Sequence, residues 1–467
     1  MSCPEISTWA TEMFGTCELG DKRRPKRLVK IAERIAANPS ASFPDQTDSW
    51  GDLKAVYRLF AALKVTFAAV AKPHWEHTRA QVRGRTLVIC DTTELDFGCN
   101  RQIKGAKPTG NGSGRGFLLH NALMVDAETK AVLGLAGQAV HYRPEVPKSK
   151  KKETPTESLA RKRESELWGE VIDDIGAPAD GVEYVCVCDR GADNFEVFVH
   201  LQQQKSQWVI RARELKRHLV TMDDQTMPLS KFLDHMELRG TYDLHLRTRP
   251  DQPARIAKIE VSCGRVIMPL PKRKSQWLKS QSATPIALNV VRVREVDAPE
   301  GVDPIEWILY TSLPVATFAQ VWLVIEYYEA RWLVEEFHKA LKTGTSVKQR
   351  QLKDTLRLEP MVGLMSVVAV RLLKLKSLAN TEPDRPARTV VPMLWLQMLK
   401  AVRKNLSRVH DLTIYEFYRE VAKLGGFLGR KSDGEPGWIT IWRGWEKLNT
   451  LVQGAELAIQ FKGMKCG

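Results

Sequence analysis

Two aspartates follow short apolar runs of the kind that form buried strands. Asp91 follows Thr86–Cys90, and Asp189 follows Val182–Cys188. We expect each carboxylate to sit on a rigid element and to face the crevice beyond the end of a strand. Together with a third carboxylate they could hold two Mg²⁺ ions roughly 3.5–4 Å apart, an arrangement that catalyses phosphoryl transfer. Aspartates are also common turn formers, so these two positions alone leave both interpretations open.

A helical segment, YEARWLVEEFHKALK, supplies the third carboxylate. At about 100° per residue, four polar side chains fall within roughly 60° of one another on one strip: Tyr328, Arg331, Glu335 and Lys342. The neighbouring Glu336 points about 100° away from Glu335. Arg331 and Glu335 form an i,i+4 pair, so the strip could be only a salt-bridged surface. A phenol, a carboxylate and two cations also suit a site that positions metal ions and phosphates.

The spacing Tyr-x2-Arg-x3-Glu-x6-Lys reproduces the YREK signature, and the chain resembles the bacterial DDE transposases of the insertion-sequence-four family. The order Asp, Asp, Glu, with a β-rich insertion before the last acid, is part of the same resemblance. Further similar stretches occur through nearly the whole chain: ELGDKRRPKRLVKIA, CDTTELDF, SGRGFLLHNAL, CDRGADNFEVF, RWLVEEFHKALKTG, LGGF and GWITIWRGWEKL.

This resemblance implies roles for individual residues. Asp91, Asp189 and Glu335 would be the catalytic triad, holding two Mg²⁺ ions, for which Mn²⁺ could substitute, in an RNase H-like core. The DNA contacts are expected at phosphates near the cut and along the transposon end, from Tyr328, Arg331, Lys342, Arg211, Arg190, Arg23, Arg24 and Arg27. Trp307 matches an indole that stacks on a flipped base, although the bare sequence favours an ordinary strand tryptophan in the core.

The reaction implied by the resemblance is cut-and-paste transposition by a homodimer that pairs two double-stranded transposon ends in a synaptic complex. An activated water nicks the DNA and frees a 3′-OH, which attacks the opposite strand to form a hairpin. A second water reopens the hairpin, and the same 3′-OH then attacks target DNA. Base flipping would relieve crowding at the hairpin.

The elements that must position these residues follow from hydrophobic periodicity. Residues 1–80 predict a helical N-terminal DNA-binding domain in which Asp21 could cap a basic helix; a helical cap on the next domain is the alternative. Residues 81–351 predict an α/β domain in the order β-β-β-α-β-α-β, with a β-rich insertion at about 213–306. The resemblance implies that this is the catalytic domain, of the RNase H-like class. One long helix is expected from Thr317 to about Gly344.

Residues 352–467 predict a helical C-terminal domain, interrupted at NTEPDRPART and GRKSDGEPG, which is a candidate for dimerisation. Three tryptophans there, Trp438, Trp442 and Trp445, fall at i, i+4 and i+7 on one helical stripe. The stripe could pack within the domain or form a dimer interface, and the sequence leaves both open.

Cysteines and histidines point away from zinc. The eight cysteines are scattered over a long chain, so reduced thiols are expected. Cys186 and Cys188 share one face of a predicted strand, which favours core packing. His74 and His77 have helical spacing but lack further ligands nearby.

Composition sets broader limits. The chain has 467 residues, about three domains' worth, with 43% hydrophobic and 27% charged residues, which argues against a disordered chain. Its 70 Lys and Arg against 55 Asp and Glu leave a net charge of +15. That excess favours a nucleic-acid partner, but it could be merely a basic surface, as the Lys148–Lys152 run is expected to be.

Neither a membrane span nor a secretory signal is expected. The longest apolar stretch, Met361 to Leu373, is shorter than the ~18 residues needed and contains Arg371. The N-terminal MSCPEISTWATEMF lacks the basic and apolar regions of a signal peptide. We therefore expect a cytoplasmic bacterial protein, associated with the nucleoid when it is bound to DNA.

Two other functions are compatible with part of these features. A metal-dependent nuclease of the same fold would cleave without strand transfer, and the YREK strip argues against it. A non-catalytic DNA-binding inhibitor of transposition would need no triad, and the intact Asp, Asp, Glu set argues against that. The leading hypothesis is an enzyme, a DDE transposase.

Overall fold

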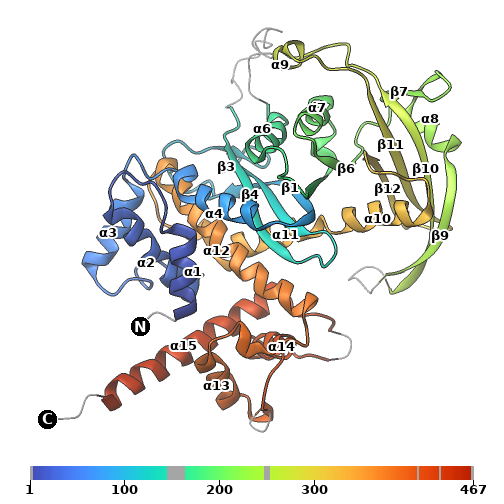
Figure 1. The fold of residues 1–467 in the computed structure, drawn as a ribbon. Coiled ribbons are helices and arrows are strands. Elements are labelled where there is room, and N and C mark those ends of the chain that lie inside the picture. Colours follow the sequence, from blue (N-terminus) through green and yellow to red (C-terminus); the bar gives the residue numbers. More distant parts are fainter. Residues whose placement is uncertain (1–3, 145–162, 247–252, 407–409, 431–432, 464–467) are drawn as a thin grey trace.

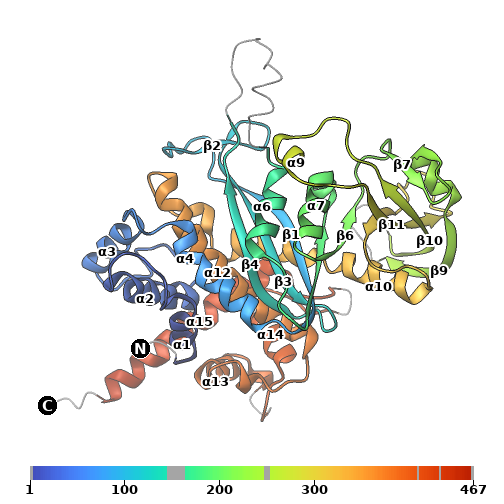
Figure 2. The ribbon, with the colours of Figure 1, turned by 45° about the horizontal axis from the view of Figure 1, so that its top comes forward.

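A computed structural model describes residues 4–144, 163–246, 253–406, 410–430 and 433–463. Its centre is a mixed β-sheet, with helices of the N- and C-terminal regions gathered at one end (Figures 1 and 2). The strand order is β2-β3-β1-β5-β6-β12-β11-β10-β7-β8, with β4 beside β3 and β9 beside β10. The predicted fold class, an α/β core with a β-rich insertion and helical ends, is confirmed.

The core half of the sheet forms as the strand pattern predicts. β1 (Gly84–Asp96) pairs antiparallel with β3 (Gly114–Asp126), which pairs antiparallel with β4 (Val132–His141) and with the short β2 (Lys107–Thr109). On its other side, β1 pairs parallel with β5 (Val182–Cys188), and β5 pairs parallel with β6 (Gln207–Arg211). Helices α6 (Glu166–Ile175) and α7 (Phe195–Gln203) make the parallel connections.

Strand β1 is longer than predicted, and this changes the place of Asp91. The sequence indicates a strand ending at Asp91, but β1 continues to Asp96 because residues 91–96 keep pairing with β3. The parallel pairing with β5 does stop there, at Cys90 opposite Cys188. Asp91 therefore lies within a strand, at the point where β1 extends past the end of its parallel neighbour.

The insertion continues the same sheet. Strand β12 (Glu306–Thr311) pairs with β6 on one side and with β11 (Ile286–Val296) on the other. The insertion places β10 (Arg255–Met268), β9 (Glu237–Leu246), β7 (His218–Thr221), β8 (Thr226–Pro228) and α8 (Leu229–Phe232) beyond β11. Its helix α9 (Gln276–Ser280) instead packs against α7 of the core, where the Trp277 ring stacks on His200 with centroids 3.8 Å apart. The insertion is thus tied to the core through hydrogen-bonded strands.

The prediction of one continuous helix from Thr317 to Gly344 is wrong. α10 (Phe318–Glu329) ends, α11 (Trp332–Lys339) begins, and a π-helical turn covers Ala340–Gly344. At the junction the backbone changes to i→i−3 hydrogen bonds, from Arg331 N to Tyr328 O and from Val334 N to Arg331 O. A uniform turn of 100° per residue therefore does not hold along the segment.

The N-terminal region contains α1 (Pro4–Phe14), α2 (Arg23–Ala37), α3 (Trp50–Phe60) and α4 (Phe67–Gln81). As predicted, α2 is amphipathic, and its buried face includes Leu28, Ile31 and Ile35. Asp21 is not the cap of this helix, since Lys22 holds that position; Asp21 Oδ1 accepts instead from Arg23 N at 2.9 Å.

The C-terminal region contains α12 (Thr355–Thr381), α13 (Met393–Val402), α14 (Ile414–Leu424) and α15 (Trp438–Gly463). The two predicted breaks coincide with the connections before α13 and before α15. α12 runs from the catalytic region to the C-terminal helices, and its stretch Met361–Val370 is buried throughout. No described helix is long and apolar enough to cross a membrane. The Lys148–Lys152 run lies outside the described residues.

Candidate active site

Asp91 is held in a largely buried, crowded position. Its side chain is 16% exposed, its carboxylate accepts from Thr92 N at 2.7 Å, and Arg331 Nη1 lies 3.4 Å from its Oδ2. Burial raises the pKa of Asp91 to about 6, and the nearby charges of Asp189 and Glu335 add to the rise, against the attraction of Arg331. The ionisation of Asp91 is therefore coupled to the charges of both other members of the predicted triad.

Asp189 follows β5 and caps the short turn η1 (Arg190–Ala192), where its Oδ1 accepts from Gly191 N at 2.8 Å. A Cβ at residue 191 would lie 2.9 Å from that oxygen and 3.0 Å from the ring of Trp168, so the turn needs glycine. The turn places Asp189 at the carboxyl end of β5. This is also where the parallel pairing of β1 and β5 stops, one residue before Asp91.

Glu335 reaches the same place from α11. Its Oε1 accepts from Arg331 Nη2 at 2.5 Å, and the same guanidinium contacts Asp91 through its other nitrogen. The predicted i,i+4 pair of Arg331 and Glu335 exists, but the guanidinium lies between two carboxylates and is only 18% exposed. Within the described residues, no group of three or more His, Cys, Asp or Glu side chains is already arranged around one metal position.

Tyr328, Trp307 and Arg211 line the adjoining side. The rings of Trp307 and Tyr328 meet edge to face with centroids 5.1 Å apart, and Arg331 lies 5.9 Å from the Tyr328 centroid. Burial raises the pKa of Tyr328, opposed by the charges of Arg211 and Arg331. Arg211 also donates to Glu306 O at 3.0 Å. Trp307 is half-buried and packs against the core that includes Tyr328, so both its role as a base-stacking platform and its role as a core tryptophan stay predictions.

Lys342 and Arg190 stand at the margins of this group. Lys342 lies on the π-helical turn, where burial and the charge of Lys348 lower its pKa while Asp91 and Glu94 oppose that shift. Arg190 is exposed on the turn directly after Asp189.

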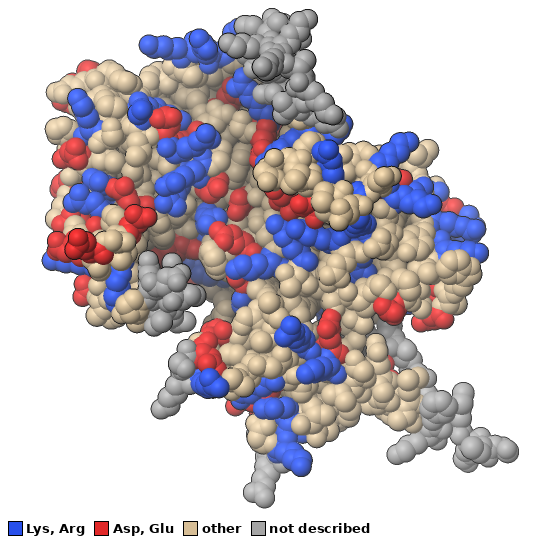
Figure 3. Space-filling model, turned by 180° about the vertical axis from the view of Figure 1, so that it is seen from behind, with Lys and Arg blue, Asp and Glu red and all other residues tan. Residues whose placement is uncertain are grey.

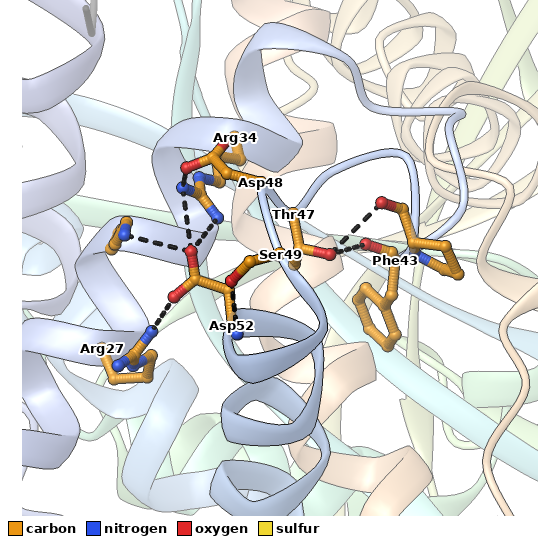
Figure 4. Close-up of polar contacts among 9 residues, drawn as sticks. Arg27, Arg34, Phe43, Thr47, Asp48, Ser49 and Asp52 are labelled. Carbon is orange, nitrogen blue, oxygen red and sulfur yellow. Dashed lines mark hydrogen bonds and ion pairs between the residues drawn. The ribbon is translucent and has the colours of Figure 1, made fainter.

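The predicted N-terminal DNA contacts lie on α2, away from this site, and each is engaged within the chain. Arg23 pairs with Asp21 at 2.8 Å, Arg24 donates to Leu19 O at 2.6 Å, and Arg27 pairs with Asp52 at 2.7 Å. Asp52, near the start of α3, also takes contacts from Lys30 at 3.3 Å and Arg34 at 3.4 Å (Figure 4). One carboxylate thus gathers three cations of α2.

Sequence reasoning missed a buried polar network beneath Asp91. Asn121, opposite Asp91 on β3, contacts His338 of α11 at 3.1 Å and accepts from Gln138 Nε2 at 2.6 Å. Gln138 in turn donates to Ser366 of α12 at 3.2 Å. Burial lowers the pKa of His338 to about 3, so its imidazole is neutral. The motif HNAL was the available signal, but only the tertiary fold shows its partners.

His120, the other half of that motif, contacts Thr92 Oγ1 at 2.8 Å and packs against Trp168 with centroids 4.4 Å apart. Its pKa is lowered to about 3 by burial. The two core cysteines behave as predicted, since Cys186 and Cys188 are buried in one apolar cluster. His74 is also a core residue, accepting through Nε2 from Leu135 N at 3.2 Å.

On the molecular face shown in Figure 3, basic side chains lie on both sides of a furrow that divides its upper part, with acidic side chains interspersed among them. Such a distribution suits a polyanionic partner.

Two segments match known families. Residues 6–65 match the transposase DNA-binding family, and residues 367–464 match the Tn5 transposase dimerisation-domain family. Both matches are to transposase families, and together they support a Tn5-like DNA transposase. It is an enzyme acting on DNA, with a DNA-binding region that includes α2 and α3 and a dimerisation region that includes α13, α14 and α15. The site built around Asp91 lies between the two matched segments.

Among solved structures, this transposase is similar to a chain of a piggyBac transposase synaptic complex with hairpin DNA. The two share 12% identity over 87% of this chain and 83% of that chain, with a TM-score of 0.36. At that TM-score the likeness carries no weight for the fold or the function.

Proposed function

We propose that the protein is a cut-and-paste DNA transposase of the DDE type, with Asp91, Asp189 and Glu335 as its catalytic residues. It would cleave transposon ends by metal-dependent hydrolysis through a hairpin and join the 3′-OH ends to target DNA. The observation that supports this most is the contact of one guanidinium, that of Arg331, with both Asp91 and Glu335, while the charge of Asp189 helps to raise the pKa of Asp91.

The donor set fits Mg²⁺. Carboxylate oxygens are the ligands that Mg²⁺ and Mn²⁺ prefer, and repulsion among the three acids is the kind of strain that a divalent cation relieves. Arg331 would have to give up part of its contact with these acids. When bound, two Mg²⁺ ions would activate a water and stabilise the leaving oxygen.

The basic and aromatic residues would position the DNA. Arg331, freed from a carboxylate, presents a planar fork to a phosphate beside the acids. Lys342 and Arg211 add charge on two sides, and Tyr328 offers a hydroxyl. Trp307, with its edge-to-face contact on Tyr328, would provide a platform for an unstacked base. Exposed Arg190 would contact the backbone from the turn after Asp189.

The terminal regions would assemble the reaction. Arg23, Arg24 and Arg27 would bind the transposon end by exchanging their internal acceptors for phosphates. A homodimer would hold two ends in a synaptic complex before target DNA is captured. A cytoplasmic location at the bacterial nucleoid stays a prediction.

The direct test is incubation with Mg²⁺ and DNA that carries the termini of the protein's own element. We expect hairpin intermediates only with the correct termini, and none with Asp189→Ala. Undiminished cleavage by Asp189→Ala would refute the triad. A pre-cleaved end and a target plasmid test joining: cleavage without joining would identify a nuclease instead.

A further inference from the structure

The three tryptophans of α15 contact two different parts of the molecule. Trp438 and Trp442 stack with ring centroids 5.5 Å apart and belong to the core that contains the α11 region. Trp445 instead contacts Trp395 and Phe417 among the C-terminal helices. The stripe therefore packs within the chain, and its first two rings lie against the segment that carries Glu335.

Glu336 is the residue through which α15 meets α11. Its buried carboxylate accepts from Trp438 Nε1 at 2.5 Å and Lys339 Nζ at 3.1 Å, and it pairs with Lys376 of α12. The Lys376 ammonium also lies 4.8 Å from the Trp438 ring centroid. Three charged or polar donors around a buried carboxylate fix the orientation of its side chain.

A second contact secures the other end of the same segment. Gly344, the last residue of the π-helical turn that carries Lys342, lies directly under Trp442: a Cβ at residue 344 would be 2.1 Å from Trp442 Cζ2. α15 thus contacts the segment one residue after Glu335 and two residues after Lys342.

α15 is itself anchored and continuous. A Cβ at Gly444 would lie 1.7 Å from Val421 O, so α14 and α15 cross at backbone contact. The helix has 26 residues and spans about 39 Å at ~1.5 Å per residue. Its far end projects from the body in Figure 1 and exposes Leu451, Leu457 and Ile459. One helix therefore links the dimerisation region to the catalytic segment.

We propose that Glu336 is a positioning residue, which Trp438 and Lys376 hold so that the C-terminal dimerisation region sets the placement of Glu335 and Lys342. This inference rests on the proposed role of Glu335. Because the contact is made through one indole N–H and one ammonium, it can be removed without touching the catalytic carboxylates or the DNA-binding helices.

The test uses the full-length protein and three variants. Trp438→Phe removes the N–H and keeps a ring on Trp442. Glu336→Gln keeps an acceptor but loses the charge. Trp445→Phe is the matched control, because it makes the same change two turns along the same helix, where the ring contacts only C-terminal helices.

At saturating DNA and Mg²⁺ we expect Trp438→Phe to cleave about tenfold more slowly, Glu336→Gln to be intermediate, and Trp445→Phe to stay within about twofold. In calorimetric titration with Mn²⁺ alone, Trp438→Phe and Glu336→Gln should bind Mn²⁺ about tenfold more weakly than the parent. Trp445→Phe should bind it as the parent does. End binding by gel shift should match the control. The thermal midpoint should fall by only a few degrees, because the buried Glu336 carboxylate loses one of its donors.

Equal losses in Trp438→Phe and Trp445→Phe, or a loss that follows the thermal midpoint alone, would reduce the contact to general packing and overturn the proposal. Failure of the proposed function would look different. If Glu335→Gln cleaved normally, the catalytic assignment would fall; if Glu335→Gln were inactive and Trp438→Phe unaffected, only the positioning role would fall.

Discussion

Two arginine–carboxylate groups in this transposase share their chemistry and differ in their surroundings. Where α2 meets α3, three cations, Arg27, Lys30 and Arg34, contact the single carboxylate of Asp52, which is half-buried (Figure 4). Where the parallel pairing of β1 and β5 ends, one cation lies between two carboxylates: the half-buried Arg331 contacts both Asp91 and Glu335. In the first group one carboxylate faces three cations, so the hydrogen bond from Arg27 holds the pKa of Asp52 below its usual value, and positive charge is left over for phosphates. The second is desolvated, so each of its charges alters the ionisation of the others.

The largest expected effect comes from a substitution in the group around Arg331. Glu335→Gln removes one charge that Arg331 shares with Asp91 and one expected metal ligand, so the end-cleavage rate should fall by about a thousandfold or more. Gel shifts should show end binding within a few fold of the parent, because α2 is untouched. A comparable loss of end binding would mean that the two arginine groups are not independent.

The next effect concerns pH and the buried acid. The folded-state pKa of Asp91 is about 6, above the ordinary value of 3.8 for an aspartate. The native state therefore binds more protons between these values, and the ionised carboxylate destabilises the fold fully above pH ~6 and not below pH ~4. Asp91→Asn should raise the thermal midpoint of the metal-free protein at pH 8 more than at pH 5, while abolishing cleavage.

Thermal unfolding of both proteins at the two pH values measures this difference. If Asp91→Asn shifted the thermal midpoint equally at pH 5 and pH 8, ionisation of Asp91 would not lower the stability of the folded state. In the parent, Mn²⁺ binding should weaken as the pH falls through about 6, because protonated Asp91 is a poor ligand.

The smallest expected effect comes from a substitution in the group around Asp52. Asp52→Asn frees Arg27, Lys30 and Arg34 from a carboxylate, so end binding should tighten about threefold at low salt, with a steeper salt dependence. Asp21→Asn, which releases only Arg23, is the matched control and should change binding less. Weaker binding by Asp52→Asn would mean that Asp52 orients these cations for DNA.

Much of the site could be predicted from the sequence because its geometry is local. Arg331 and Glu335 are four residues apart on a helix, so their contact follows from helical periodicity. Asp189 follows a buried strand, and the apolar run of β5 places it at the sheet edge. The YREK spacing adds Tyr328 and Lys342 by resemblance.

Other features could not be predicted because they depend on partners far along the chain. The length of β1 beyond Asp91 depends on pairing with β3, some 30 residues later. The helical break at Arg331 and the π turn at Lys342 arise where α10 and α11 meet the packed sheet and α12. The partners of Asn121, His338 and Ser366 come from three separate elements.

Glu336 shows the same division within one residue. The sequence alone determined that it points away from Glu335 on α11, because helical geometry is set by the backbone. Only the tertiary structure decided what it meets there, since Lys376 and Trp438 come from helices 40 and 102 residues later. Side-chain direction is a local property, whereas the burial and donors that make a direction matter come from distant segments packed together.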